Sequence, residues 1–385
     1  MKKELFPGWI LMTAIAAVSL VLSNQITAGG KHPLEATALA VVLGVLARNV
    51  KLVPALFHAG IKTFEKFLIW GIILIGATLN FKDFESQGPQ MLAIILGTML
   101  VSYLVIYALG RLFKLPWTLA TLLAVGTTIC GGSAIAVTAP LIKAREEETS
   151  YAIGTITLWG LAAILFYPKI AQLLGVTDIQ FGVFAGTSIH ATPQVVGAGF
   201  IFSDLAGKTA TAIKLVRNCF MAPLAFVIAA WYAKRPHAAA PQAGLQTGSR
   251  KFNAKGQAFG SPLDRDLDLG ASTAEEGSRA KPGAPAGAGV RAKAPAPAAA
   301  AKAFPWFLFG YFLMAGLNTA GYFSKVGIDG LTWFGRFLIT IAMAGIGLNT
   351  VFGAFKKVGL KPLIVGLLGA LVVAGVSIAL ITLVL

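Results

Sequence analysis

The chain alternates between long apolar stretches and short polar ones. A bilayer core needs about 20 mostly apolar residues per helix, and about eleven stretches approach or exceed that length. They are residues 9–26, 33–47, 67–79, 91–112, 117–142, 151–174, 181–202, 209–233, 305–320, 331–352 and 362–385. This pattern predicts an all-α integral membrane protein with about eleven transmembrane helices.

One long segment interrupts the apolar pattern. Residues 236–302 are rich in Ala, Pro, Gly, Lys and Arg, and such a composition cannot bury enough apolar surface to order a domain. The sequence therefore predicts a first membrane part at residues 1–235, a disordered cytoplasmic linker at 236–302, and a second membrane part at 303–385. The linker is either a regulatory or lipid-touching tether, or an insertion that the fold tolerates.

Composition supports a membrane location. Hydrophobic residues make up 56% of the chain and charged residues 12%, whereas a soluble domain carries about 25% charged residues. The formal net charge of +16 would suit a nucleic-acid partner. However, the basic residues lie in short loops and in the linker, which fits cytoplasmic loops and anionic lipid instead. We expect a lipid bilayer as partner and no nucleic acid.

Loop charges predict the orientation of the chain. If each stretch crosses the membrane once, one side receives Lys2, Lys3, Arg48, Lys51, Arg111, Lys114, the linker, Lys356 and Lys357. The other side receives Asp83, Glu85, Glu146, Glu147, Glu148 and Asp329, together with Lys31, Lys143, Arg145 and Lys325. The more basic side is cytoplasmic. This predicts a multi-pass protein of the bacterial inner membrane with its N-terminus inside and its C-terminus outside.

Two apolar stretches contain similar polar breaks. Gly126-Thr127-Thr128-Ile129 opens the first, and Gly186-Thr187-Ser188-Ile189 opens the second. Irregular backbone at membrane depth is tolerated only where it is buried or lines a cavity, and paired breaks of this kind mark transporter substrate sites. With one full crossing between them, the two segments would run parallel. Either one of these three segments does not cross fully, or the similarity is convergent.

A longer similarity links residues 66–81 with residues 336–350. Each begins with a basic residue before Phe-Leu-Ile, and each reaches a Gly-x-x-Leu-Asn sequence, at Asn80 and Asn349. The predicted orientation makes the two helices antiparallel. Such a pair predicts inverted-topology repeats, which are common in secondary transporters.

Basic and titratable residues also lie inside the apolar stretches. Lys214, Arg217 and Asn218 share one face of the eighth stretch by their spacing. They attract an anion or support the core, or else Lys214 and Arg217 snorkel to the interface. His190 lies in the second break, where it either carries a proton, because the reference imidazole pKa is about 6.5, or is a hydrogen-bonded structural histidine.

The breaks also gather small groups that can bind an anion. Their hydroxyls, amides and free backbone N–H groups suit anion oxygens, although hydroxyls can instead satisfy the broken backbone. The predicted substrate-binding residues are Thr127, Thr128, Gly131, Gly132, Ser133, Ser188, His190, Thr192, Gln194, Lys214, Arg217 and Asn218. Cys130 and Cys219 lie in apolar stretches and imply no disulfide framework. No metal, cofactor or catalytic residue set is predicted, so we do not expect an enzyme.

Three motifs resemble those of a known family. They are Gly131-Gly132-Ser133-Ala134-Ile135-Ala136, Ser188-Ile189-His190-Ala191-Thr192-Pro193-Gln194-Val195, and the stretch from Lys208 to Asn218. They resemble the signatures of the bacterial sulfate exporter family, and the likeness covers both membrane parts. That family is similar to the cation/proton antiporter and bile-acid symporter class. The resemblance implies inverted repeats, a core of unwound crossing helices, and a separate panel that often mediates a homodimer.

The sequence thus predicts a secondary transporter of a small anion such as sulfate or a sulfonate. It would work by alternating access, with proton coupling through His190. A cation-coupled carrier of an organic acid is the first alternative, but it calls for a carboxylate near a break, and neither break contains one. A membrane receptor or scaffold that signals through the linker is the second. No ATP-binding loop occurs, so transport would use an ion gradient or exchange.

Overall fold

The computed structural model describes residues 3–25, 35–50, 52–82, 88–233, 306–355 and 359–384. The predicted linker, residues 236–302, lies outside them. All regular elements in the described part are helical, which confirms the predicted fold class. The main helices are α1 (Phe6–Gln25), α2 (Ala36–Asn49), α3 (His58–Ile61), α4 (Phe64–Ile75), α6 (Gly88–Leu112), α7 (Trp117–Thr128), α8 (Gly132–Leu141), α9 (Glu146–Leu173), α10 (Asp178–Ser188), α11 (Thr192–Phe202), α12 (Asp204–Cys219), α13 (Met221–Ala233), α15 (Phe307–Thr319), α16 (Lys325–Asn349), α17 (Phe352–Phe355) and α18 (Leu360–Val384).

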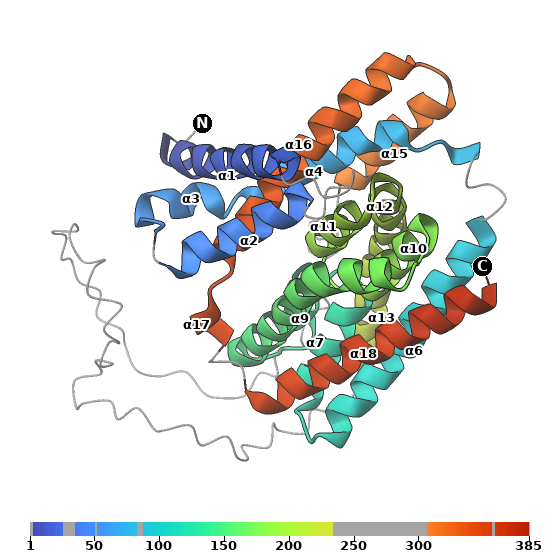
Figure 1. Cartoon of the computed structure of the whole chain (residues 1–385). Helices are drawn as coiled ribbons and strands as arrows, with labels where there is room; N and C mark the ends of the chain where they lie inside the picture. Colours follow the sequence, from blue (N-terminus) through green and yellow to red (C-terminus); the bar gives the residue numbers. More distant parts are fainter. Residues whose placement is uncertain are drawn as a thin grey trace, which may run out of the picture. The chain divides into compact units, whose positions relative to one another are not determined.

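The helices form two packed groups (Figure 1). The first, here called the panel, contains α1, α2, α4, α15 and α16. The second, here called the core, contains α6 to α13 together with α18. The apolar cluster inside the panel also includes Leu161, Val196, Phe200, Ala212 and Leu215, which belong to α9, α11 and α12 of the core. The panel and the core are therefore in direct contact along these three core helices.

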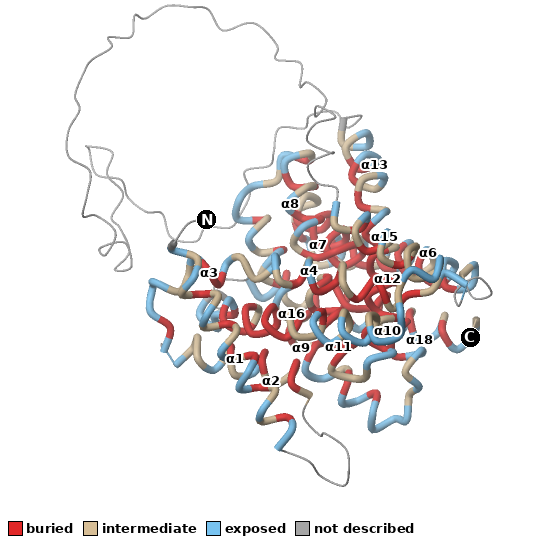
Figure 2. Tube along the Cα trace, turned by 90° about the horizontal axis from the view of Figure 1, so that it is seen from above, coloured by how far each residue is buried: buried red, intermediate tan, exposed pale blue. Residues whose placement is uncertain are grey.

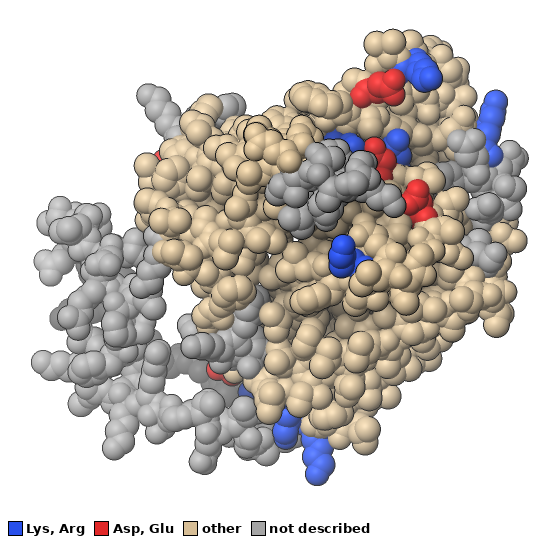
Figure 3. Space-filling view, in the orientation of Figure 1, with Lys and Arg blue, Asp and Glu red and all other residues tan. Residues whose placement is uncertain are grey.

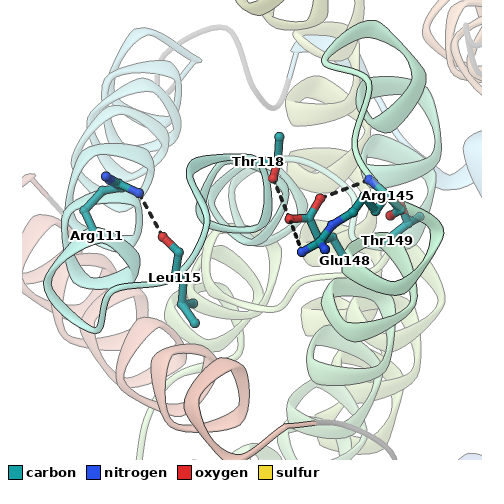
Figure 4. A network of polar contacts seen from close by, with 6 residues as sticks. All are labelled: Arg111, Leu115, Thr118, Arg145, Glu148 and Thr149. Carbon is teal, nitrogen blue, oxygen red and sulfur yellow. Dashed lines mark hydrogen bonds and ion pairs between the residues drawn. The ribbon is translucent and has the colours of Figure 1, made fainter. Parts of the chain in front are cut away.

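The first broken segment turns back on itself. A side chain at Gly126 of α7 would meet Ile135 of α8, so the two arms run antiparallel. Near the start of α7, the hydroxyl of Thr118 donates to Glu148 of α9 over 2.8 Å. Figure 4 shows this contact together with the ion pair between Arg145 and Glu148. Because α9 begins a few residues after α8 ends, α7 and α8 enter and leave at the same end; we call this re-entrant pair hairpin 1.

The second broken segment turns back as well. Phe181, near the start of α10, stacks on Phe202, at the end of α11, with ring centroids 4.2 Å apart. The two arms, here called hairpin 2, both pack against α12. Gly182 of α10 and Gly199 of α11 both approach the same turn of α12, at Ala206. Since the long helix α9 runs between the two hairpins, hairpin 2 opens at the opposite end of the molecule from hairpin 1.

The two hairpins answer the question that the sequence left open, because neither broken segment crosses fully. The acidic run at Glu146, Glu147 and Glu148 lies at the hairpin 1 end, beside Thr118, so the prediction that it lies opposite Arg111 and Lys114 was wrong. That prediction failed because it gave the stretch at 117–142 one full crossing. The last turn of α13 also lies at this end, where Tyr232 stacks on Trp117 with centroids 5.4 Å apart.

The two segments of the longer similarity are antiparallel neighbours in the panel. Gly71 of α4 packs against Gly335 of α16, and Asn349 at the other end of α16 donates to the carbonyl of Ile61 over 3.1 Å. A Cβ at Gly71 would lie 2.8 Å from the carbonyl oxygen of Gly335, so the helices approach closely because both residues lack side chains. This arrangement is the one expected of an inverted-topology pair.

The surface of the molecule fits a bilayer. Six helices are long and apolar enough to cross a membrane: α1, α6, α9, the α12–α13 pair, α16 and α18. On the face drawn in Figure 3 the charged side chains are few: most lie in the upper part, one basic residue lies near the middle, and a few lie at the lower edge, while most of the remaining described surface is uncharged. Buried segments in Figure 2 concentrate around α7, α12 and α16 inside the helix bundle. The described part of the chain therefore has the architecture of an integral membrane protein.

Candidate functional site

The tips of the two hairpins meet inside the core. Gly131 caps α8 with φ +72°, a left-handed conformation that glycine adopts without steric cost. A Cβ there would lie 3.1 Å from the Cβ of Ala191, the residue that precedes α11. In hairpin 2, Ile189 and Ala191 are extended, and Pro193 sits in the first turn of α11, where its missing N–H costs nothing. We call this meeting point the tip crossing.

Arg217 ties the two hairpins together. Its side chain projects from α12, is 1% exposed, and donates only to backbone carbonyls. One terminal nitrogen, Nη1, lies 2.7 Å from the carbonyl oxygens of both Gly186 and Thr187. The other, Nη2, lies 2.5 Å from the carbonyl oxygen of Thr128 and 3.2 Å from that of Thr127. The last carbonyls of a helix have no partner within it, so one guanidinium supplies partners to the ends of both α7 and α10.

Lys214 serves the tip of hairpin 2 in the same way. Its ammonium group is fully buried and lies 3.0 Å from the carbonyl oxygen of Ile189. It also donates to the carbonyl of His190. Both Lys214 and Arg217 are buried and donate to backbone carbonyls inside the core, so the snorkelling interpretation was wrong. Both side chains support the core directly.

Asn218 and Gln194 fix the start of α11. Asn218 donates from Nδ2 to the hydroxyl of Thr192 over 3.1 Å. Gln194 accepts from the backbone N–H of Ala191 over 3.1 Å and donates to the carbonyl of Thr157 on α9 over 3.4 Å. A helix start leaves backbone N–H groups unpaired, and the Gln194 amide satisfies one of them. The Oδ1 atom of Asn218 is buried without a hydrogen-bond partner among the described residues.

The hydroxyl groups of the breaks divide into satisfied and unsatisfied ones. Ser188 donates to the carbonyl of Phe184 one turn earlier, over 2.7 Å. Thr187 shares a 2.7 Å hydrogen bond with Ser377 of α18. The Thr128 hydroxyl is buried without a partner among the described residues, while Ser133 is exposed at the start of α8. The Thr128 hydroxyl is therefore open to a ligand, whereas the Ser188 hydroxyl is used within its own helix.

His190 occupies the centre of the hairpin 2 tip. The residue is 2% exposed, its carbonyl accepts from Lys214, and the Nδ1 atom of its ring has no hydrogen-bond partner among the described residues. An unpaired buried ring nitrogen is costly, so a native structure normally supplies it with a partner such as a water or a ligand. The ring nitrogen Nδ1 of His190 therefore leaves a position for a hydrogen-bonding partner at the tip crossing.

Charges at the tip crossing do not cancel. Each helix end carries about half an elementary charge, negative at the C-terminus and positive at the N-terminus. The C-termini of α7 and α10 together carry about one negative charge, which offsets the permanent positive charge of Arg217. The N-termini of α8 and α11 then add positive charge, and Lys214 adds more when protonated. Residues 117–142, 179–203 and 205–233 contain no Asp or Glu, so the described part of the tip crossing is electropositive.

The predicted site residues thus come together, although in different roles. They are Thr127 and Thr128 at the end of α7; Gly131, Gly132 and Ser133 at the start of α8; Ser188, His190, Thr192 and Gln194 in hairpin 2; and Lys214, Arg217 and Asn218 on α12. Sequence reasoning missed Gly160 on α9, where a Cβ would lie 1.8 Å from Oε1 of Gln194. It also missed Ser377 on α18. The only sequence signal for Gly160 and Ser377 was that each is a small residue within a long apolar stretch.

Comparison with known proteins identifies the family. The family model described as Conserved hypothetical protein 698 matches residues 7–248 and 290–366. The gap between these ranges, residues 249–289, lies entirely inside the predicted linker. A UPF0324 membrane protein of Clostridium tetani is 27% identical over 370 residues, which cover 96% of this chain and 94% of the relative.

Other relatives give the same result. A UPF0324 membrane protein of Bacillus cereus is 28% identical over 364 residues, covering 94% of this chain and 89% of the relative. One from Agrobacterium fabrum is 34% identical over 222 residues, covering 57% of this chain and 64% of the relative. The chain therefore belongs to the Conserved hypothetical protein 698 family of bacterial membrane proteins.

Proposed function

We propose that this protein is a secondary transporter that moves a small anion across the bacterial cytoplasmic membrane by alternating access. The tip crossing carries the proposal. Two re-entrant hairpins from opposite ends meet there, and non-helical backbone at membrane depth belongs where it is buried or lines a cavity. Transporter substrates bind at such interruptions near the bilayer midplane.

The charge of the tip crossing selects the substrate class. Helix N-termini bind anions through backbone N–H groups, and the starts of both α8 and α11 lie here. A Cβ at Gly132 would meet no atom within 4 Å, so the start of α8 leaves room for a ligand. A sulfate or sulfonate offers several acceptor oxygens for these N–H groups and for Ser133. The family resemblance of the motifs points to the same anions.

The orientation follows from the hairpins. With both hairpins re-entrant, Arg111, Lys114, Lys143 and Arg145 all lie at the hairpin 1 end, where α13 also leads into the basic linker. The positive-inside rule then assigns that end to the cytoplasm. In the topology predicted from single crossings, Lys143 and Arg145 were on the other side. With re-entrant hairpins they join the basic residues at this end, so the difference in basic charge between the two ends is larger.

Proton coupling would use His190. A proton on its ring and an anion at the tip crossing would attract one another, so the two would bind cooperatively. The carrier would then move an anion together with a proton. Apart from Asp178, at the start of α10, the four hairpin arms contain no Asp or Glu that could carry the proton instead.

Anion binding to the purified protein tests the proposal. The thermal stability of the protein in detergent would be measured with sulfate, thiosulfate or methanesulfonate, at constant ionic strength with chloride as reference. Ligands that bind the folded state raise its stability with concentration. We expect the thermal stability to rise saturably with the concentration of at least one of these anions. Varying the concentration of choline or sodium should cause no such rise. A saturable rise with a varied cation, and none with any anion, would refute the anion assignment.

A further inference from the structure

Arg336 connects the panel to the core at the hairpin 2 end. It projects from α16, and its Nη1 atom lies 2.8 Å and 2.9 Å from the two carboxylate oxygens of Asp204, the first residue of α12. Its guanidinium carbon lies 5.9 Å from the ring centroid of Phe200 on α11. On the panel side, its Nη2 atom lies 3.8 Å from a carboxylate oxygen of Glu35, the residue before α2.

The two core partners of Arg336 belong to the elements that build the tip crossing. Asp204 begins the helix that carries Lys214 and Arg217, and Phe200 lies in the second arm of hairpin 2. The contact therefore joins the panel to the part of the core that holds the candidate substrate site. A movement of that part against the panel at this end has to break the contact between Arg336 and Asp204.

The contact is built to open at low cost. The Arg336 side chain is 36% exposed, that of Asp204 50% and that of Glu35 30%. Solvated pairs of this kind contribute about 0–1 kcal/mol. Next to Arg336 lies a cavity of about 430 Å³ between α1, α2 and α16, lined by Glu35, Asp329 and Thr332 among others. The cavity gives the guanidinium room to turn, and its two carboxylates offer partners that belong to the panel.

We propose that Arg336 is an exchangeable latch between the panel and the core. With Asp204 as partner, it holds hairpin 2 and α12 against the panel and closes the hairpin 2 end. When this end opens, the guanidinium passes to Glu35 and Asp329 and remains paired throughout. The inference rests on the proposed function, because it assumes that the core moves against the panel during transport.

Thiol labelling tests the latch without any substrate. Ser133→Cys, at the tip of hairpin 1, is the reporter in a background with Cys130→Ser and Cys219→Ser. A membrane-impermeant maleimide is added from the hairpin 2 end. We expect Asp204→Asn and Arg336→Gln each to raise the labelling rate several-fold. We expect Glu35→Gln to lower it, because the alternative partner is lost. Asp178→Asn is the matched control, an acid in the first turn of α10 at the same end.

The charge swap separates the latch from general loosening. Asp204→Arg combined with Arg336→Asp restores the pair with reversed charges, so its labelling rate should return close to that of the parent. Equal rates for Asp204→Asn and Asp178→Asn, no restoration by the swap, or no labelling from this end in any variant would overturn the proposal. Size-exclusion profiles confirm that each variant is folded. A failure of anion transport would not alter these rates, so the two proposals fail separately.

Discussion

The guanidinium of Arg217 lies 2.5 Å from the carbonyl oxygen of Thr128, at the point where α7 ends. The same group reaches Gly186 and Thr187 in the last turn of α10. The similar sequences Gly126-Thr127-Thr128-Ile129 and Gly186-Thr187-Ser188-Ile189 are therefore two helix ends that bind one side chain. Each glycine is also required by close packing: Gly126 against Ile135 and Ile156, and Gly186 against Ile213.

Replacing Arg217 should weaken the fold as well as any anion binding. In Arg217→Gln the buried carbonyls of α7 and α10 lose their donor, and each orphaned group costs about 1–3 kcal/mol. We expect the free energy of unfolding in detergent to fall by about 3 kcal/mol or more. Arg145→Gln, which removes a largely exposed guanidinium, should change it by less than about 1 kcal/mol. If the two variants were equally stable, Arg217 would not stabilise the fold through these carbonyls.

The tip of hairpin 1 offers a test with adjacent glycines. Gly131→Ala forces a left-handed conformation on alanine and places its Cβ 3.1 Å from that of Ala191. Because ψ is −128°, this conformation lies outside the left-handed helical region, and we expect a loss of about 1–3 kcal/mol in stability from the backbone alone. Gly132→Ala, where a Cβ meets nothing within 4 Å, should be nearly neutral for stability. If the two variants unfold at the same temperature, the tips do not meet as described.

The re-entrant hairpins predict which loops share a side of the membrane. In a background without the native cysteines, Glu147→Cys should react with an impermeant thiol reagent from the same side as Lys361→Cys. Gln172→Cys, at the other end of α9, should react from the opposite side. All three positions are exposed. Glu147→Cys and Lys361→Cys labelled from opposite sides would mean that hairpin 1 crosses the membrane.

The linker prediction concerns residues outside the described part of the chain. Replacing residues 238–300 with a short Gly/Ser loop should preserve folding and anion binding, because this composition lacks the apolar surface of a domain. Thermal unfolding and the anion-induced stabilisation of the shortened protein are the measurements. A well-folded variant that no longer transports would instead assign the linker a role in gating.

Much of the fold could be predicted from the sequence because the lengths of the apolar stretches indicate the helices directly. Most apolar stretches became single helices within about six residues of their expected bounds, whereas those at 117–142, 181–202 and 209–233 each became two helices. The polar breaks became the tip crossing. The reversal of each hairpin could not be predicted, since it depends on contacts between distant residues such as Phe181 with Phe202 and Thr118 with Glu148. Period and composition do not distinguish an arm that turns back from one that continues.

The roles of the polar residues were harder to predict than their location. Lys214, Arg217 and Asn218 share a helix face, as their spacing indicated, but their partners are backbone groups and the Thr192 hydroxyl. A sequence does not show which carbonyls are left unpaired at a break. Gln194 likewise has the amide expected of a ligand contact, whereas the structure uses it to cap α11 against α9.

Uptake into proteoliposomes tests the central claim most directly. Radiolabelled sulfate, thiosulfate and methanesulfonate would be offered to vesicles containing the parent or His190→Gln, with and without an inward proton gradient. We expect saturable uptake of at least one anion, falling as the pH rises, because the protonated His190 ring and the anion would bind together. His190→Gln should flatten that pH dependence before it abolishes binding. An active His190→Gln protein with the parental pH profile would leave His190 a structural role. Uptake of every anion no faster than in protein-free vesicles, with correctly inserted and folded protein, would contradict the account.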